Sequence, residues 1–184
     1  MSEALYDIPV KTIDGRETSL DNWRGKVLLV VNVASKCGLT PQYEGLEKLY
    51  EDKRADGLVV LGFPTNNFRA QEPGTNGEIV EFCTTKFGVE FPMFEKISVR
   101  GADQHPLYRR MIAVRPHATA KPGSDFKAKL AGLGIKQDDE RDVLWNFEKF
   151  LIARNGEVVA RFAPDVEPQD QILRQAVEQE LAQS

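Results

Sequence analysis

The 184-residue chain is poor in the residues that build metal centres and structural disulfides. It has two cysteines, Cys37 and Cys83, and two histidines, His105 and His117, whose spacings match no zinc-binding pattern. Because a reducing cytosol keeps thiols free, two cysteines there are more typical of redox chemistry than of a structural disulfide. We therefore expect no metal and no cofactor, and we interpret both histidines as structural.

A basic excess, a leader and a long hydrophobic run are also lacking. The net charge of −4 argues against a general nucleic-acid partner. The start, MSEALYDIPVKTIDG, has no basic residues followed by an apolar stretch, so no secretory signal is expected. The longest apolar run, residues 27–33, is too short to cross a bilayer. These features predict a cytoplasmic protein without membrane insertion.

The hydrophobic pattern predicts one α/β domain over residues 1–184. Continuous apolar runs, typical of buried strands, alternate with stretches whose apolar residues recur at helical spacing. Strands are expected at 26–33, 58–63, 147–153 and 157–162 after a hairpin over 10–20, and helices at 40–57, 78–87, 105–114 and 168–182. Two buried strands joined by a helix imply a parallel pair, hence a central mixed β-sheet flanked by helices. A cysteine after the first core strand suggests the thioredoxin-like fold, here with an N-terminal β-hairpin.

Turn and capping residues add detail to the helices. Asn76 is expected to cap the helix over 78–87, and Pro168 to open the last helix. The polar segment 116–142 is expected to form a long loop with one short helix.

Cys37 stands between the first buried strand and a helix start, in the stretch NVASKCGLTPQY. A helix N-terminus and the neighbouring Lys36 both lower the pKa of a thiol, and the thiolate is the nucleophile. The alternative is a buried structural cysteine. Thr40 occupies the position of the second cysteine of a CxxC motif, so a local disulfide cannot form. A sulfenic acid at Cys37 would condense with another thiol, and Cys83 is the other one in the chain.

The chain resembles the glutathione peroxidases, in their cysteine-containing bacterial form. Four ordered segments carry the resemblance, which runs from Ile13 to Asp170: GKVLLVVNVASKCGLTPQY (25–43), LGFPTNNFRAQEPG (61–74), FCTTKFGVEFPMFEKI (82–97) and LWNFEKFLIARNGEVVARF (144–162). It departs from the family's FPCNQF stretch, with Thr65 for the cysteine and Asn67 for the glutamine.

The resemblance implies a thiol-dependent peroxidase that reduces hydrogen peroxide and organic hydroperoxides in the response to oxidative stress. Cys37 matches the cysteine that attacks the peroxide, and Gln71, Trp145 and Asn146 match the active-site glutamine, tryptophan and asparagine. Their N–H groups are neutral donors that can stabilise the thiolate and orient the peroxide. Without the family, Trp145 would be interpreted as a core aromatic and the two amides as turn or surface residues.

Cys83 matches the resolving cysteine of the thioredoxin-dependent members, which favours thioredoxin over glutathione as reductant. A disulfide needs Cα atoms within about 7 Å, so we expect the helix around Cys83 to unwind partly before the Cys37–Cys83 bond closes. The alternative for Cys83 is a buried helix residue. Two other functions remain: a redox sensor that passes oxidation to a partner protein, and a non-catalytic thioredoxin-like binding module.

Overall fold

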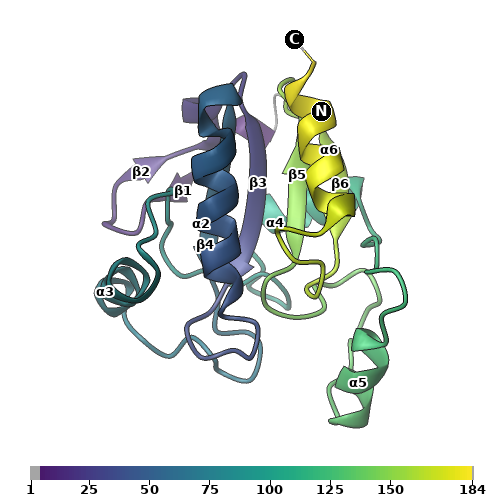
Figure 1. Ribbon diagram of the computed structural model, residues 1–184. Helices are drawn as coiled ribbons and strands as arrows, with labels where there is room; N and C mark the ends of the chain where they lie inside the picture. Colours follow the sequence, from purple (N-terminus) through teal and green to yellow (C-terminus); the bar gives the residue numbers. More distant parts are fainter. Residues whose placement is uncertain (1–4, 184) are drawn as a thin grey trace.

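The computed structural model describes residues 5–183 and contains a four-stranded mixed sheet between two layers of helices (Figure 1). The strand order is β4-β3-β5-β6, with β3 parallel to β4 and antiparallel to β5, and β5 antiparallel to β6. The strands are β3 (Val27–Val33), β4 (Leu58–Pro64), β5 (Lys149–Ile152) and β6 (Val158–Phe162). The thioredoxin-like fold predicted from the sequence is therefore confirmed. Residues 1–4 and 184, which the predicted domain also includes, lie outside the described residues.

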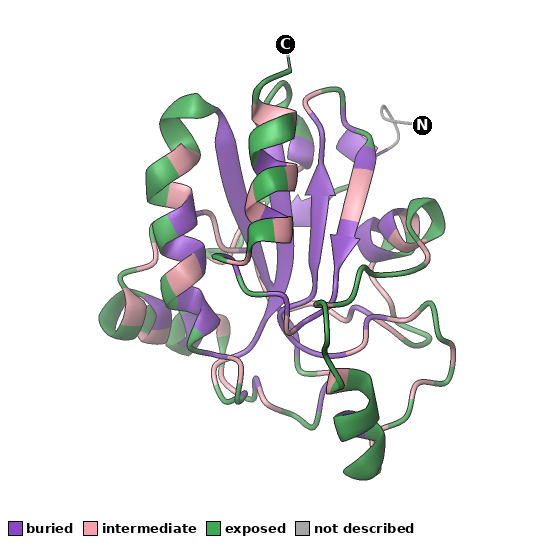
Figure 2. Cartoon of the chain, turned by 45° about the vertical axis from the view of Figure 1, so that its right-hand side comes forward, coloured by how far each residue is buried: buried purple, intermediate pink, exposed green. Residues whose placement is uncertain are grey.

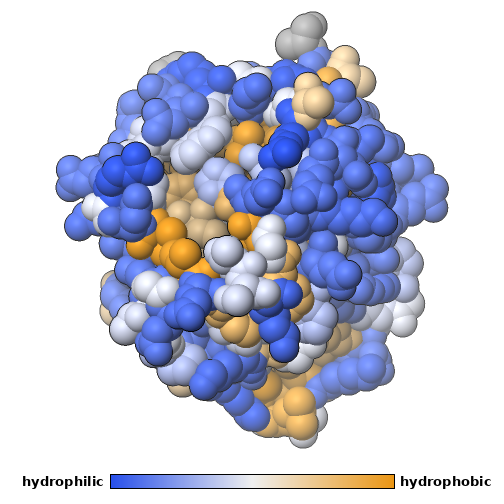
Figure 3. All heavy atoms as spheres, turned by 60° about the vertical axis from the view of Figure 1, so that its left-hand side comes forward, coloured by the Kyte–Doolittle hydropathy of each residue, from blue (hydrophilic) through white to orange (hydrophobic). Residues whose placement is uncertain are grey.

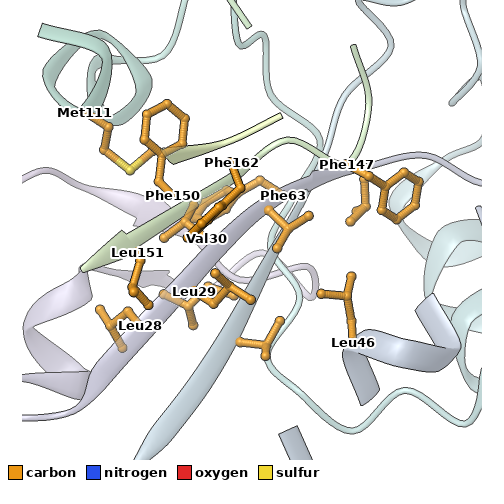
Figure 4. Close-up of a cluster of buried hydrophobic side chains, with 14 of the residues drawn as sticks. Leu28, Leu29, Val30, Leu46, Phe63, Met111, Phe147, Phe150, Leu151 and Phe162 are labelled. Carbon is orange, nitrogen blue, oxygen red and sulfur yellow. The ribbon is translucent and has the colours of Figure 1, made fainter. Parts of the chain in front are cut away.

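The central strands are apolar because both faces of the sheet are covered. Every residue of β3 and β4 is buried. Helices α2 (Gln42–Lys53) and α6 (Gln171–Leu181) lie on one face and α4 (Pro106–Val114) on the other (Figures 1 and 2). Figure 4 shows side chains from β3, β5 and α4 meeting in this core, among them Val30, Phe150 and Met111.

Both predicted hairpins are present. β1 (Val10–Lys11) and β2 (Glu17–Thr18) pair antiparallel in a separate small sheet, and the turn between them places Gly15 at φ +90°. The turn between β5 and β6 places Gly156 at φ +88°. Glycine adopts these left-handed conformations without the steric cost that a side chain would add.

Two helix starts differ from the sequence prediction. Helix α3 (Asn76–Phe87) is capped by Thr75, whose hydroxyl accepts the Glu78 N–H at 3.2 Å, while the Glu78 carboxylate accepts the Thr75 N–H at 2.9 Å. The predicted Asn76 cap is wrong, because the Asn76 side chain accepts the Lys96 N–H instead, at 3.0 Å.

The last helix, α6, begins at Gln171, and its N-cap is Asp170. The prediction that Pro168 opens this helix is wrong, because a separate turn precedes it. In that turn the Asp170 N–H donates to the Glu167 carbonyl at 3.0 Å, and the Glu167 N–H donates to the Asp170 carboxylate at 2.9 Å.

The remaining helical segments are short. A 3₁₀ turn η1 (Leu20–Trp23) precedes β3, and η2 (Arg54–Asp56) links α2 to Gly57 and β4. The segment 116–142 contains one short helix, α5 (Phe126–Gly132), as predicted, and this helix projects from the sheet core and is mostly exposed (Figures 1 and 2). No helix in residues 5–183 combines the length and apolarity needed to cross a membrane.

Candidate active site

Cys37 lies in a tight turn between the end of β3 and the start of α2. Its backbone N–H donates to the Thr40 hydroxyl at 2.9 Å, and that hydroxyl donates to the Ala34 carbonyl at 2.8 Å. The side chain of Thr40 therefore closes the turn around the cysteine. The structure thus gives Thr40 a role of its own at the position where a CxxC motif carries its second cysteine.

The sulfur of Cys37 receives a backbone hydrogen bond within the same turn. The Leu39 N–H points at Sγ, with an N–S distance of 3.3 Å. This bond helps to fix the position of the sulfur within the turn. The Cys37 residue is 8% exposed, so the sulfur lies just below the surface.

Two predicted site residues, Gln71 and Asn146, form a hydrogen bond beside this turn. The Asn146 Nδ2 donates to Gln71 Oε1 at 3.0 Å, although 75 residues separate them in the chain. The Gln71 carbonyl also accepts the Lys36 N–H at 3.0 Å. A chain of short contacts therefore connects the residue before Cys37 to both amides.

The end of β3 holds the segment that contains Trp145 and Asn146. The Asn32 side chain donates to the Trp145 carbonyl at 3.2 Å, and the Asn32 carbonyl accepts the Phe147 N–H at 2.6 Å. The Trp145 ring packs on Phe68 with centroids 5.3 Å apart. The structure therefore brings the predicted tryptophan and asparagine to the same end of the sheet as Cys37.

Backbone strain is concentrated next to the two amides. Three non-glycine residues in the described chain have positive φ: Arg69 at 53°, Ala70 at 51° and Phe147 at 68°. Arg69 and Ala70 directly precede Gln71, and Phe147 directly follows Asn146. Such conformations cost roughly 1–3 kcal/mol each and persist only where surrounding contacts hold them. The strained backbone on either side of Gln71 and Asn146 therefore lowers the stability of the fold while it fixes where these two residues lie.

Cys83 is held differently, in the third turn of α3. It is 2% exposed, and its carbonyl accepts the Val89 N–H at 3.2 Å. Its side chain is therefore buried, and its backbone is hydrogen-bonded to the segment that follows α3. Burial raises the pKa of the Cys83 thiol to about 11; the Tyr43 hydroxyl lowers it by less, and the nearby Glu72 raises it further. Both Cys37 and Cys83 are free thiols.

Comparison with known proteins assigns the family. The glutathione peroxidase family model matches residues 5–112. The chain is 49% identical over 182 residues to the thioredoxin/glutathione peroxidase BtuE of Escherichia coli K12, covering 99% of this chain and all of that protein. The chain belongs to the glutathione peroxidase family.

Solved structures agree with this assignment. A crystal structure described as Trgpx in apo form superposes with a TM-score of 0.69 at 35% identity, covering 97% of this chain and 96% of the other. A putative thioredoxin from Neisseria meningitidis, at 14% identity and a TM-score of 0.58, covers 96% of this chain and 89% of the other and shares the fold alone. The protein is thus a peroxidase of the glutathione peroxidase family, an oxidoreductase that reduces peroxides by thiol chemistry.

The two departures of this glutathione peroxidase from its family pattern have a local explanation. Thr65 is fully buried and donates its hydroxyl hydrogen to Asn67 Oδ1 at 2.7 Å. The Asn67 amide donates to the Ser98 hydroxyl at 3.1 Å, and its oxygen accepts the Val99 N–H at 2.6 Å. The Asn67 side chain therefore ties the loop after β4 to residues 98–99.

Some residues around the site of this peroxidase were not expected from the sequence. Lys149 of β5 is fully buried and donates to Gln42 Oε1 at 2.6 Å and to the Pro164 carbonyl at 2.9 Å, which fixes the first residue of α2. Burial lowers the pKa of Lys149 to about 7. The signal in the sequence was a lysine inside an otherwise apolar strand. A lysine buried there requires several hydrogen-bond acceptors for its ammonium group.

Glu72, next to Gln71, was also missed. It is 1% exposed, and burial raises its pKa. A charged residue inside a family motif was the signal in the sequence, but only the fold shows that its carboxylate is buried near Cys83 and Tyr43.

Proposed function

We propose that this protein is a two-cysteine peroxidase that reduces hydrogen peroxide and organic hydroperoxides and is regenerated by thioredoxin. The observation that carries the proposal is the hydrogen-bonded connection between the Cys37 turn and the Gln71–Asn146 pair. It supports the proposal that neutral donors act on a thiol whose sulfur already receives an N–H bond. We further propose a cytoplasmic location and a role in the response to oxidative stress.

In the first step the Cys37 thiolate attacks the terminal oxygen of the hydroperoxide. The S–O bond forms as the O–O bond breaks, leaving a sulfenic acid, and the departing alkoxide or hydroxide takes a proton to become an alcohol or water. Asn146, Gln71 and Trp145 orient the peroxide and stabilise the charge as it moves from sulfur to oxygen. Because these donors are neutral, no histidine base is required.

In the second step the Cys83 sulfur attacks Cys37, the S–O bond breaks, and water leaves. The two cysteines are then joined by a disulfide, which a dithiol protein reduces by thiol–disulfide exchange. Cys83 is buried within α3, so we propose that the helix opens locally before this step. A dithiol reductant suits an intramolecular disulfide, which favours thioredoxin; glutathione remains the alternative.

The test is peroxide turnover with thioredoxin or with glutathione, for wild type, Cys37→Ser and Cys83→Ser. Cys37→Ser is expected to lose turnover with both reductants, by about a thousandfold or more. Cys83→Ser is expected to lose turnover with thioredoxin while its Cys37 still reacts with peroxide. Equal turnover of wild type and Cys83→Ser with thioredoxin would contradict the resolving role.

The burial of Cys83 also bears on a second function, a redox sensor that passes oxidation to a partner protein. If Cys83 reacts only after the helix opens, a sulfenic acid at Cys37 lasts long enough to react with a thiol of another protein. Slow turnover with both free reductants, together with a mixed disulfide to a specific partner, would favour the sensor over the peroxidase cycle.

A further inference from the structure

Glu148 and Arg161 form an ion pair inside the protein, and the steps proposed above do not use it. Charged side chains normally face water, and hydrophilic residues cover most of the face shown in Figure 3. Glu148 is 1% exposed and Arg161 is 3% exposed, and their Oε2 and Nε atoms are 2.6 Å apart. Because apolar residues often replace a buried ion pair without loss of stability, the stability of the fold does not by itself explain why this pair is present.

The Glu148 carboxylate also closes the short segment that contains two of the site residues. Its Oε1 accepts the Leu144 N–H at 2.9 Å, so one side chain joins the two ends of this segment. Between those ends lie Trp145 and Asn146, which are 7% and 0% exposed, and Phe147, whose φ is 68°. The carboxylate therefore holds a strained backbone in the conformation that places the tryptophan and the asparagine.

Arg161 fixes this carboxylate in turn. While its Nε donates to Glu148, its Nη1 donates to the Arg115 carbonyl and its Nη2 to the Arg141 carbonyl, each at 2.9 Å. The guanidinium also lies over the Phe150 ring, with Cζ 4.9 Å from the ring centroid. A planar group that is held at all three of its nitrogens has little freedom to rotate, so the carboxylate that it binds is kept in one orientation.

We propose that Glu148 is a positioning residue for the attack of Cys37 on peroxide, an inference that rests on the proposed roles of Trp145 and Asn146. Its carboxylate sets where these two side chains lie and so keeps their N–H groups in place for the reaction. Donors stabilise a developing charge only within hydrogen-bond distance of it, and a displacement of about 1 Å can slow a reaction a hundredfold. Glu148 acts through the two residues and takes no part in the chemistry itself.

The role requires a carboxylate, because both of the groups that Glu148 binds are hydrogen-bond donors. Glu148→Gln keeps the shape of the side chain but leaves it with one acceptor oxygen and an NH₂ group. That NH₂ group has to face a donor, either the Leu144 N–H or the Arg161 guanidinium, so one of the two bonds is lost. The substitution therefore tests the position of the segment with little change in volume.

The experiment measures peroxide attack, the surroundings of Trp145 and the free energy of unfolding in one set of variants. All of them, including the reference protein, carry Trp23→Phe, so that Trp145 is the one tryptophan left of the two in the chain. Attack by hydrogen peroxide is followed by trapping the sulfenic acid with a dione, the tryptophan by its emission and its quenching by acrylamide, and unfolding by urea titration. The test variants are Glu148→Gln and Arg161→Lys, and the control is Glu47→Gln.

Glu47 matches Glu148 in burial and in the kind of bond it makes. It is 5% exposed, and its carboxylate accepts the Glu90 N–H at 2.7 Å. That bond ties α2 to the chain that follows α3 and does not involve the segment that holds Trp145. Glu47→Gln therefore shows what the loss of a buried carboxylate does to the protein without the proposed effect on position.

Glu148→Gln is expected to slow peroxide attack by about thirtyfold, to shift the Trp145 emission to longer wavelength and to increase its quenching by acrylamide. Arg161→Lys keeps the positive charge but loses the planar fork, so the same changes should appear with a slowing of about tenfold. Glu47→Gln should keep the rate and the emission of the reference protein. Disulfide closure, once Cys37 is oxidised, should keep its rate in all variants.

Peroxide attack and tryptophan emission that are unchanged in folded Glu148→Gln would overturn the inference. An equal slowing in Glu47→Gln would overturn it too, because the rate would then follow stability and not the position of the segment. If Glu148→Gln does not fold, Arg161→Lys decides by the same two measurements. Failure of the proposed site is distinct, since Asn146→Ala would then react with peroxide at the rate of the reference protein.

Discussion

Cys37 and Cys83 belong to the same chain but lie in opposite environments. Cys37 is in a turn at the end of a strand, just below the surface, with a backbone N–H directed at its sulfur. Cys83 lies inside a helix, 2% exposed, where burial raises the pKa of its thiol to about 11. The difference shows how a fold assigns two chemical roles to one residue type. In the proposed cycle one thiol meets the incoming oxidant, and the other reacts only after its helix has opened.

The largest expected effect is on alkylation, which measures the contrast between the thiols directly. At pH 7 the single thiol of Cys37→Ser should react with iodoacetamide roughly 300-fold more slowly in the folded protein than in urea, because folding buries Cys83 and raises the pKa of its thiol to about 11. The single thiol of Cys83→Ser should react faster in the folded protein, because Cys37 lies just below the surface. The Cys83 rate should rise about tenfold per pH unit up to that pKa. In urea the two rates should converge, and similar rates in the folded protein would remove the contrast.

A second prediction tests whether the hydrogen-bonded pair Gln71 and Asn146 affects the reaction of Cys37 alone. Asn146→Ala removes the donor that holds Gln71 Oε1 at 3.0 Å. We expect sulfenic acid formation at Cys37 to slow by about a hundredfold, the usual effect of losing a donor at a developing charge. Disulfide closure, once Cys37 is oxidised, should keep its rate. If only disulfide closure slowed, Asn146 would act on the reaction of Cys83 and not on that of Cys37, which would contradict the prediction.

A third prediction concerns the helix that protects Cys83. Gly88 follows α3 at φ +59°, and a side chain there would meet nothing within 4 Å, so Gly88→Ala acts through backbone strain of about 1 kcal/mol. Thr75→Ala weakens the opposite end by a similar amount. Because Cys83 is nearer the C-terminal end, Gly88→Ala should speed disulfide closure about fivefold and Thr75→Ala should not. Equal effects would mean that α3 does not open from the Gly88 end.

The sequence predicted the sheet well because its signals are local. Residues 27–33 and 58–63 are apolar apart from Asn32, and Asp14-Gly15 and Asn155-Gly156 are turn pairs. The start of α3 was misjudged because two adjacent residues compete for the cap. Thr75 wins, since Glu78 three residues later completes a reciprocal pair with it.

The candidate site was predicted in part. Four positions came from the resemblance, and the structure joins Gln71 to Asn146 by a hydrogen bond. The burial of Glu72 and Tyr43 could not be predicted, because it depends on how the segment before Cys37, the loop after β4 and α3 pack together. The role of Thr40 was equally hidden, since its partners are the backbone of Cys37 and of Ala34, six residues back.

The smallest expected effect tests that role of Thr40. Thr40→Val keeps the shape of the side chain but leaves the Cys37 N–H and the Ala34 carbonyl without their partner, whereas Thr40→Ser keeps both bonds. Thr40→Val should lower the free energy of unfolding by about 1–2 kcal/mol, measured by urea titration. It should slow peroxide attack about threefold, equivalent to roughly 0.7 kcal/mol in the barrier. Thr40→Ser should match wild type in both. If Thr40→Val also matches wild type, the backbone alone sets the geometry of the turn. The reactivity of Cys37 toward peroxide then depends on the Leu39 N–H and the residues around the site.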